Sequence, residues 1–116
     1  MAGVSFEELI THVKLSADKL DKQCSDEHIT SISLFLTNWQ TVAPHLGLTE
    51  TDEEDVNEDA KRTQDKRYRT LRTWKAKNSF KATYKVLVDV FLKIGRADLA
   101  EKVCRFLVDE GIYIHA

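Results

Sequence analysis

The chain has 116 residues, of which 42% are hydrophobic and 31% are charged, and its formal net charge is −2. A chain of this length fits one domain and can bury a core without help from disulfides or metals. The composition is typical of a soluble globular protein. Its 4 glycines and 1 proline argue against disorder and against turn-rich β folds.

The sequence shows no signal for membrane insertion or secretion. It has no run of about 18 apolar residues, and residues 1–8 turn acidic before the apolar region of a signal peptide could form. Gly3 is one position too late for myristoylation. Cys24 and Cys104 are too few for a disulfide framework. We therefore expect a cytoplasmic protein that does not bind membranes.

The charges balance overall but are segregated along the chain. Residues 50–59 contain seven acids and no base, whereas residues 60–85 contain ten bases and one acid, Asp65. Segregated charge steers association with charged partners but does not set the fold. The alternative is that both segments are solvated helix faces with no binding role.

Capping residues and apolar periodicity predict the helices, beginning at the N-terminus. Ser5 and Glu8 form a capping box, and the apolar stripe behind them predicts one amphipathic helix over residues 6–22. Leu15 falls on the polar face of that helix. The helix would either lie over the rest of the domain and extend its core, or instead pair with another chain or block an assembly face.

Two shorter helices are expected next. Ser25 caps the first of them, and Ile29 begins its apolar face. The second covers residues 38–46 and contains Pro44, which has no N–H and clashes with the preceding turn, so this helix must be short, kinked or late in starting. Gly47 is a residue type that commonly ends a helix.

Thr49 or Thr51 caps an acidic helix that ends near residue 58, and a long basic helix follows over residues 60–77. The segment 82–94 is apolar almost all round, which is typical of a helix at the centre of a domain. A β-strand is the alternative there, but the run is too long for one.

A last helix over residues 97–110 ends at Gly111. The expected organisation is therefore an N-terminal helix and linker over 1–24, a helical bundle over 25–111 and a short tail over 112–116. The connections within the bundle are short, so neighbouring helices should pack roughly antiparallel.

The sequence offers no arrangement suited to catalysis, metal binding or a cofactor. His12, His28, His45 and His115 do not pair with one another or with a cysteine at the spacing of metal ligands. The glycines are too few for a phosphate-binding loop. We expect a protein that is not an enzyme and that has neither a metal nor a cofactor.

The apolar faces of the predicted helices supply the expected core. Tryptophans on such stripes are more often core anchors than binding residues. The expected core anchors are Trp39, Leu46, Leu71, Trp74, Leu87, Phe91, Leu99 and Val103.

Four segments resemble the sequence pattern of the death domain, in its order and at its spacing. Residues 39–48 read W-x-x-x-A-x-x-L-G-L, residues 71–74 read L-x-x-W, residues 82–87 read A-T-x-x-x-L and residues 95–101 read G-R-x-D-L-A-E. The resemblance extends over residues 28–110, where six helices are predicted.

The chain also departs from that pattern. Pro44 is unusual in the second helix of a death domain, and the N-terminal helix lies outside the pattern. Arg96, Asp98 and Leu99 match the R-x-D-L of death effector domains as well. The tryptophan-based anchors favour the death domain.

The resemblance implies an all-α fold, a six-helix antiparallel bundle of Greek-key-like topology, to which the N-terminal amphipathic helix is added. It also implies a non-enzymatic adaptor that binds other death-domain proteins, or copies of itself, in apoptotic or innate-immune signalling. In the family, the second and third helices commonly meet the first and fourth helices of a neighbour. The end of the fourth helix meets the fifth-to-sixth-helix corner.

Carried over to this chain, those contacts define three sets of interaction residues. The acidic third-helix face consists of Glu53, Glu54, Asp55, Glu58 and Asp59. The basic fourth-helix face consists of Arg62, Lys66, Arg69, Arg72, Lys75 and Lys77. The fifth-to-sixth-helix corner consists of Arg96 and Asp98. Such a surface is self-complementary between copies, but the two charged helices could instead pair within one chain and leave a monomer.

A helical domain that binds nucleic acid through the basic stripe over residues 61–85 is the alternative function. Domains of that class are usually basic overall. The isoelectric point of this chain, about 6.1, disfavours it. We therefore expect protein partners and no nucleic acid.

Overall fold

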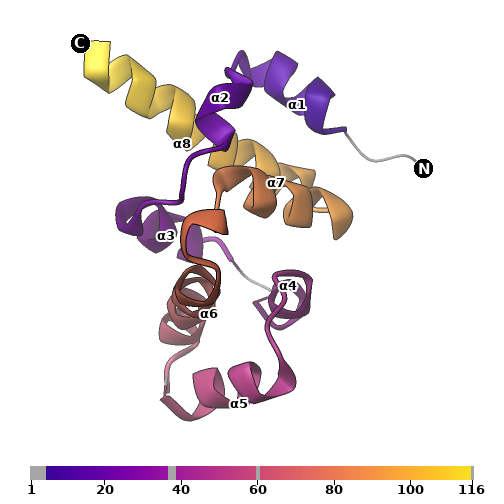
Figure 1. Ribbon diagram of the computed structural model, residues 1–116, viewed down its shortest axis with the longest axis vertical. Coiled ribbons are helices and arrows are strands. Elements are labelled where there is room, and N and C mark those ends of the chain that lie inside the picture. Colours follow the sequence, from indigo (N-terminus) through magenta and orange to yellow (C-terminus); the bar gives the residue numbers. More distant parts are fainter. Residues whose placement is uncertain (1–4, 37–38, 60, 116) are drawn as a thin grey trace. The chain divides into compact units, whose positions relative to one another are not determined.

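The structure is a computed structural model that describes residues 5–36, 39–59 and 61–115. The side chains of residue 17, residue 59 and residues 109–115 lie outside the described part. The regular elements are α1 (Phe6–Val13), α2 (Ala17–Leu20), α3 (Asp26–Ser33), α4 (Trp39–His45), α5 (Glu50–Asp59), α6 (Thr63–Asn78), the 3₁₀ turn η1 (Ser79–Lys81), α7 (Tyr84–Lys93) and α8 (Ala97–His115). No strand occurs among these residues (Figure 1), so the all-α prediction is confirmed.

The chain forms two units. The first combines Met1–Lys22 with Thr83–Ala116 and contains α1, α2, α7 and α8. The second is Gln23–Ala82 and contains α3, α4, α5, α6 and η1.

Helix α7 is the centre of the first unit, because α1, α2 and α8 all pack against it. The hydroxyl of Thr83 caps it by accepting a hydrogen bond from the amide of Val86 at 3.4 Å. Leu87 and Phe91 are fully buried, and most of the remaining side chains of the helix are buried or half-buried. The prediction of a buried central helix is confirmed, and the β-strand alternative is wrong.

The prediction of a single helix over residues 6–22 is wrong. The capping box at Ser5 is present, since its hydroxyl accepts a hydrogen bond from the amide of Glu8 at 3.1 Å. Helix α1 nevertheless ends at Val13, and Lys14 takes the left-handed conformation with φ 58° and ψ 43°. The short helix α2 then begins at Ala17.

A Schellman motif causes this break. The amide of Leu15 donates to the carbonyl of Ile10 at 3.0 Å, and the amide of Lys14 donates to the carbonyl of Thr11 at 3.2 Å. The turn buries Leu15, which a continuous helix would have exposed on its polar face. An apolar residue just after a left-handed cap is the usual companion of this motif, so Leu15 was itself the signal for the break.

Helix α6 is the centre of the second unit, because α3, α4 and α5 each pack against it. Its own buried side chains are those of Thr70, Leu71 and Trp74. Ile32 of α3 and Val42 of α4 are also fully buried. The core anchors predicted in this helix, Leu71 and Trp74, are therefore buried, although the helix begins at Thr63 and not near residue 60.

Helix α4 is short, which was one of the outcomes expected from Pro44. The proline lies in its last turn. Gly47 then adopts φ 83°, and the amide of Leu48 returns to the carbonyl of Ala43 at 3.1 Å. Gly47 therefore ends the helix as predicted, in a conformation that costs glycine no Cβ clash.

The prediction that the last helix ends at residue 110 is also wrong, since α8 continues to His115. Glycine inside a helix costs about 1 kcal/mol relative to alanine, but it stops the helix only where the backbone turns to positive φ. Gly95 does so, with φ 78°, and separates α7 from α8. Gly111 lies within the helix.

The left-handed backbone at Lys14 leads to a stability prediction. A non-glycine residue in this conformation costs about 1 kcal/mol, so Lys14→Gly should raise the free energy of unfolding by roughly 0.5–1 kcal/mol. Urea unfolding followed by circular dichroism measures the change. The matched control is Lys66→Gly, inside α6, which should lower stability by about 1 kcal/mol. Equal losses in both variants would contradict the assigned turn.

Candidate protein-interaction surface

Helix α5 carries the acidic face. Thr49, and not Thr51, begins it: the Thr49 amide donates to Asp52 Oδ2 at 2.8 Å, and the Asp52 amide donates to Thr49 Oγ1 at 3.1 Å. Val56 is 1% exposed and turns into the second unit. The acids on the other sides of the helix therefore remain in water. Of the predicted residues, Glu54, Asp55 and Glu58 are exposed and Glu53 is half-buried, while the side chain of Asp59 lies outside the described residues.

The outer side of α6 carries the basic face. Burial of Leu71 and Trp74 sets which side of the helix faces inward. At about 100° per residue, Lys66 and Arg69 project roughly opposite Leu71. Arg69 is exposed and Lys66 is half-buried. Arg62 is also exposed, and its Nε lies 3.4 Å from Oδ2 of Asp65.

Asp26, at the start of α3, engages two of the predicted basic residues. Lys75 Nζ lies 3.0 Å from Asp26 Oδ1, and Arg72 donates a hydrogen bond to the same oxygen. The hydrogen bond from Lys75 and the charge of Arg72 lower the pKa of Asp26 below its ordinary value of 3.8. These two cations therefore contribute to packing of α6 on α3 within the chain. Asp26 lies 46 and 49 residues before these two partners along the chain, so no local pattern in the sequence indicates the pairs.

A second ion pair joins α5 to α6. Lys77 Nζ lies 2.5 Å from Asp52 Oδ2. The hydrogen bond from Lys77, together with that from the Thr49 amide, lowers the pKa of Asp52 below 3.8. The predicted alternative, pairing of the acidic and basic helices within one chain, thus holds for Lys77.

The remaining predicted charges are left without an ion pair among the residues that the structure describes. They are Glu53, Glu54, Asp55 and Glu58 on α5 and Lys66 and Arg69 on α6. Ion pairs within the chain therefore neutralise only some of the charged residues of α5 and α6. The others leave a negative patch on α5 and a positive patch on α6.

The predicted corner lies between α7 and α8. Arg96 and Asp98 form a two-point contact there, with Nε to Oδ1 at 3.1 Å and Nη2 to Oδ2 at 3.0 Å. The hydrogen bonds from Arg96 lower the pKa of Asp98, and Asp98 in turn raises the pKa of Arg96. The two charges largely neutralise each other, so the corner carries little net charge.

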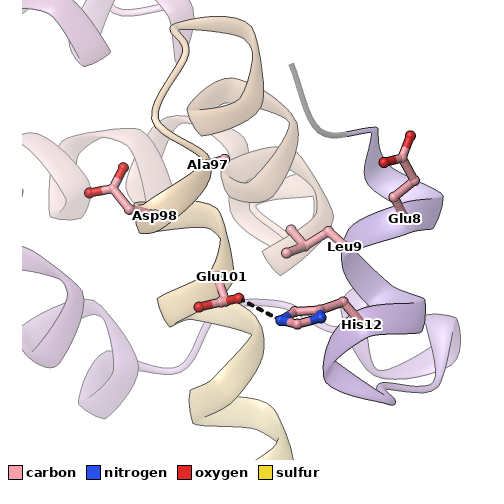
Figure 2. Close-up of a pocket in the computed structure, with 6 residues that line it drawn as sticks. All are labelled: Glu8, Leu9, His12, Ala97, Asp98 and Glu101. Carbon is pink, nitrogen blue, oxygen red and sulfur yellow. Dashed lines mark ion pairs between the residues drawn. The ribbon is translucent and has the colours of Figure 1, made fainter. Parts of the chain in front are cut away.

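A cavity of about 410 Å³ opens between α1 and α8 in the first unit (Figure 2). The Nε2 of His12 lies 3.2 Å from Oε1 of Glu101, which forms an ion pair when the imidazole is protonated. No sequence spacing links these two residues, so only packing of α1 on α8 could have identified the cavity. Its lining residues are Glu8, Leu9, His12, Ala97, Asp98 and Glu101.

The two cysteines are not placed for chemistry. Both are buried, and burial raises the pKa of Cys24 to about 12 and that of Cys104 to about 11. Thiols with such pKa values stay protonated near neutral pH and are poor nucleophiles.

The structure buries all of the predicted core anchors, with exposed fractions between 0% and 5%. They are Trp39, Leu46, Leu71, Trp74, Leu87, Phe91, Leu99 and Val103.

The family comparison bears directly on these helices. The family model described as Death domain matches residues 26–107, in which the six helices α3 to α8 begin. The chain belongs to the death domain family. Death domains are non-catalytic modules that bind other death-domain proteins, so this chain is a protein–protein interaction module in signalling. Comparison with individual curated proteins gave no match to it.

The additional helix α1 precedes the death domain match and packs on α7 and α8. This contact agrees with the prediction that the N-terminal segment extends the core. Within the described residues, none of the helices combines the length and apolarity needed to span a membrane.

The lowered pKa of Asp52 predicts acid sensitivity. A carboxylate whose pKa is lower in the folded state than in the unfolded state stabilises the fold fully at pH values above its ordinary pKa of 3.8. This stabilisation is lost as the pH falls through the folded-state pKa. We expect the free energy of unfolding to fall between about pH 5 and about pH 2. It should fall less in Lys77→Met, because this variant removes the lysine partner of Asp52. Urea titrations at several pH values measure this.

The matched control is Lys61→Met, which removes an exposed lysine with no ion pair among the described residues. It should keep the pH dependence of the wild type. An equal change in both variants would mean that the Lys77–Asp52 pair does not persist in solution.

Proposed function

We propose that this death domain is a cytoplasmic adaptor module of apoptotic or innate-immune signalling that binds other death domains through the acidic face of α5 and the basic face of α6. The module spans residues 25–111, with residues 1–24 as an added helical segment. The observation that carries the proposal is the set of opposite charges on α5 and α6 that have no ion pair within the described residues.

Ion pairs within the chain reduce the number of basic residues on α6 that are available to a partner. Arg72 and Lys75 are held by Asp26, and Lys77 is held by Asp52. Recognition of a partner therefore falls mainly to Lys66 and Arg69. Charges that remain in water add little to the stability of a fold, whereas they strongly affect the rate and selectivity of association.

The arrangement favours head-to-tail contact. The negative and positive patches lie on two different helices, so the α5 face of one copy can meet the α6 face of another and leave a free patch at each end. Such heterologous contacts build open assemblies or closed rings, not isologous dimers. The proposal also includes the second family contact, in which the end of α6 meets the corner at Arg96 and Asp98. Because the charges of the corner pair with each other, this contact depends less on net charge.

Charge reversal tests the proposed contact. We expect Glu54→Arg and Arg69→Glu each to weaken association at least about tenfold, equivalent to about 1.4 kcal/mol, without unfolding the exposed sites. An equimolar mixture of the two variants should associate again, because the reversed α5 face of one variant and the reversed α6 face of the other carry opposite charges. Size-exclusion chromatography with light scattering measures the mass of each species.

Lys22→Glu is the matched control, because it reverses an exposed charge near the start of α7, outside both charged faces and at the other end of α7 from the corner. It should leave the mass distribution unchanged. Unaltered association in both Glu54→Arg and Arg69→Glu would contradict the charged contact.

Ionic strength provides an independent test. The Debye length falls from about 8 Å at 0.15 M salt to about 3 Å at 1 M salt, so a contact between charged faces should weaken steeply over this range. We expect the apparent dissociation constant of wild-type assemblies, or of a complex with a second death domain, to rise at least about tenfold. A constant affinity would mean that these charges do not drive binding.

A further inference from the structure

Three threonines of α6 directly follow an arginine in the sequence, and the structure separates them by their accessibility. Thr70 is fully buried, and its hydroxyl donates a hydrogen bond to the carbonyl of Lys66 at 2.8 Å. Thr73 is half-buried in the interior of the helix. Thr63 is exposed, and its hydroxyl has no hydrogen-bond partner among the described residues. Of these three hydroxyls, that of Thr63 is therefore the one that an enzyme can reach.

The backbone at Thr63 also suits modification. Thr63 is the first residue of α6, and Arg62 before it is extended, with φ −91° and ψ 146°. An enzyme that modifies a side chain binds a short stretch of its substrate in an open conformation. The end of a helix opens at little cost in free energy, whereas its interior opens only with much of the fold. The chain therefore presents Thr63, but not Thr73, as a segment that fits an active site.

Cations surround the Thr63 hydroxyl in the sequence and on the helix. Lys61 and Arg62 directly precede it, and Lys66 and Arg67 follow three and four residues later, which makes them its neighbours on the helix surface. The Nε of Arg67 is buried and has no hydrogen-bond partner among the described residues. A phosphate group has three strong acceptor oxygens and pairs well with such cations. The chemistry around Thr63 therefore favours a phosphorylated side chain.

The first turn of α6 has little negative charge to compete with such a group. Its N-cap residue is Arg62, whose side chain makes no capping hydrogen bond. Asp65 is the acid of this turn, and it lies 3.4 Å from Arg62. A negative group near the start of a helix is stabilised by the amides that the first turn leaves unpaired. A phosphate on Thr63 thus agrees with the local fold of α6.

We propose that Thr63 is a phosphorylation site for a protein kinase that recognises basic residues, and that its phosphate switches off the basic face of α6. In the reaction, Oγ1 of Thr63 forms a bond to the γ-phosphorus of ATP while the bond from that phosphorus to the β–γ bridging oxygen breaks. ADP leaves, and the hydroxyl proton passes to a base of the kinase. The inference rests on the proposed function and adds its regulation.

The switch follows from the charge at the start of α6. Residues 61–69 contain five bases and one acid. A phosphate with a charge of about −2 at neutral pH lowers the net positive charge of this segment by about half. It lies one turn before Lys66, one of the two cations to which we assign recognition of a partner. The acidic α5 face of a second copy then meets a negative group where it would have met a positive patch, and association weakens.

The first experiment maps the modification on the full chain. The protein is incubated with ATP and with protein kinase A or protein kinase C, which select basic residues near the acceptor hydroxyl, and the phosphate is located by tandem mass spectrometry. We expect phosphate on Thr63, little on Thr73 and none on Thr70. Arg62→Gln should slow the reaction at least about tenfold, and Thr63→Val should remove it. No phosphate on Thr63 with either kinase, or as much on Thr73, would overturn the inference.

The second experiment measures the effect on binding. Protein phosphorylated at Thr63, made by genetically encoded phosphothreonine, should associate at least about tenfold more weakly than the unmodified protein in sedimentation equilibrium at 0.15 M salt. The matched control is protein phosphorylated at Ser16 by encoded phosphoserine. Ser16 is also exposed at the start of a helix without a side-chain capping bond, but it precedes α2 and lies outside both charged faces.

The control should associate as the unmodified protein does, and circular dichroism should show that both phosphorylated proteins are folded. Equal affinities of the unmodified protein and the protein phosphorylated at Thr63, including the case in which neither associates, would overturn the switch. An equal loss in both phosphorylated proteins would also overturn it, because the effect would then come from net charge and not from the α6 face.

The charge-reversed variant Glu54→Arg separates this inference from the proposed function. If Glu54→Arg weakens association and phosphate on Thr63 does not, the charged contact stands and the switch is overturned. If phosphate on Thr63 weakens association and Glu54→Arg has no effect, the switch stands and the contact through the α5 face is overturned.

Discussion

Burial of Leu71 and Trp74 sets the rotation of α6 about its axis, and the charge pattern of the second unit depends on that rotation. With these side chains inward, Arg72 and Lys75 reach Asp26 of α3. The same rotation leaves Arg69 exposed on the outer side and Lys66 half-buried at the edge of the inner side. A hydrophobic contact therefore decides which cations are used inside the chain and which are available to a partner.

This division of charge makes physical sense for an interaction module. Ion pairs that remain in water add little to the stability of a fold, so the pairs at Asp26 and Asp52 contribute modestly. Their larger effect is to neutralise one end of α6. The uncompensated charge is thereby concentrated on two patches, which favours one orientation of a partner over others.

Local signals in the sequence predicted most helix starts and two of the stops. Ser5, Ser25 and Thr49 were predicted as caps, and each accepts an amide hydrogen bond, because a hydroxyl beside the first turn satisfies a donor that the helix leaves open. The cap of α7 at Thr83 was not predicted. Glycine ends α4 and separates α7 from α8 because it tolerates positive φ. The break at Lys14 was missed because nothing in lysine itself favours the left-handed conformation, and the signal lay in Leu15.

The sequence by itself determined the family, the helical class, the caps at Ser5 and Ser25 and the identity of the core anchors. These follow from periodicity and from spacing between near neighbours, which act over one or two helical turns. Only the tertiary structure decided which charges pair, that α1 builds a cavity with α8, and that Phe80 is left in solvent. Those outcomes depend on contacts between residues far apart in the chain, such as His12 and Glu101, and no local pattern encodes the distance between them.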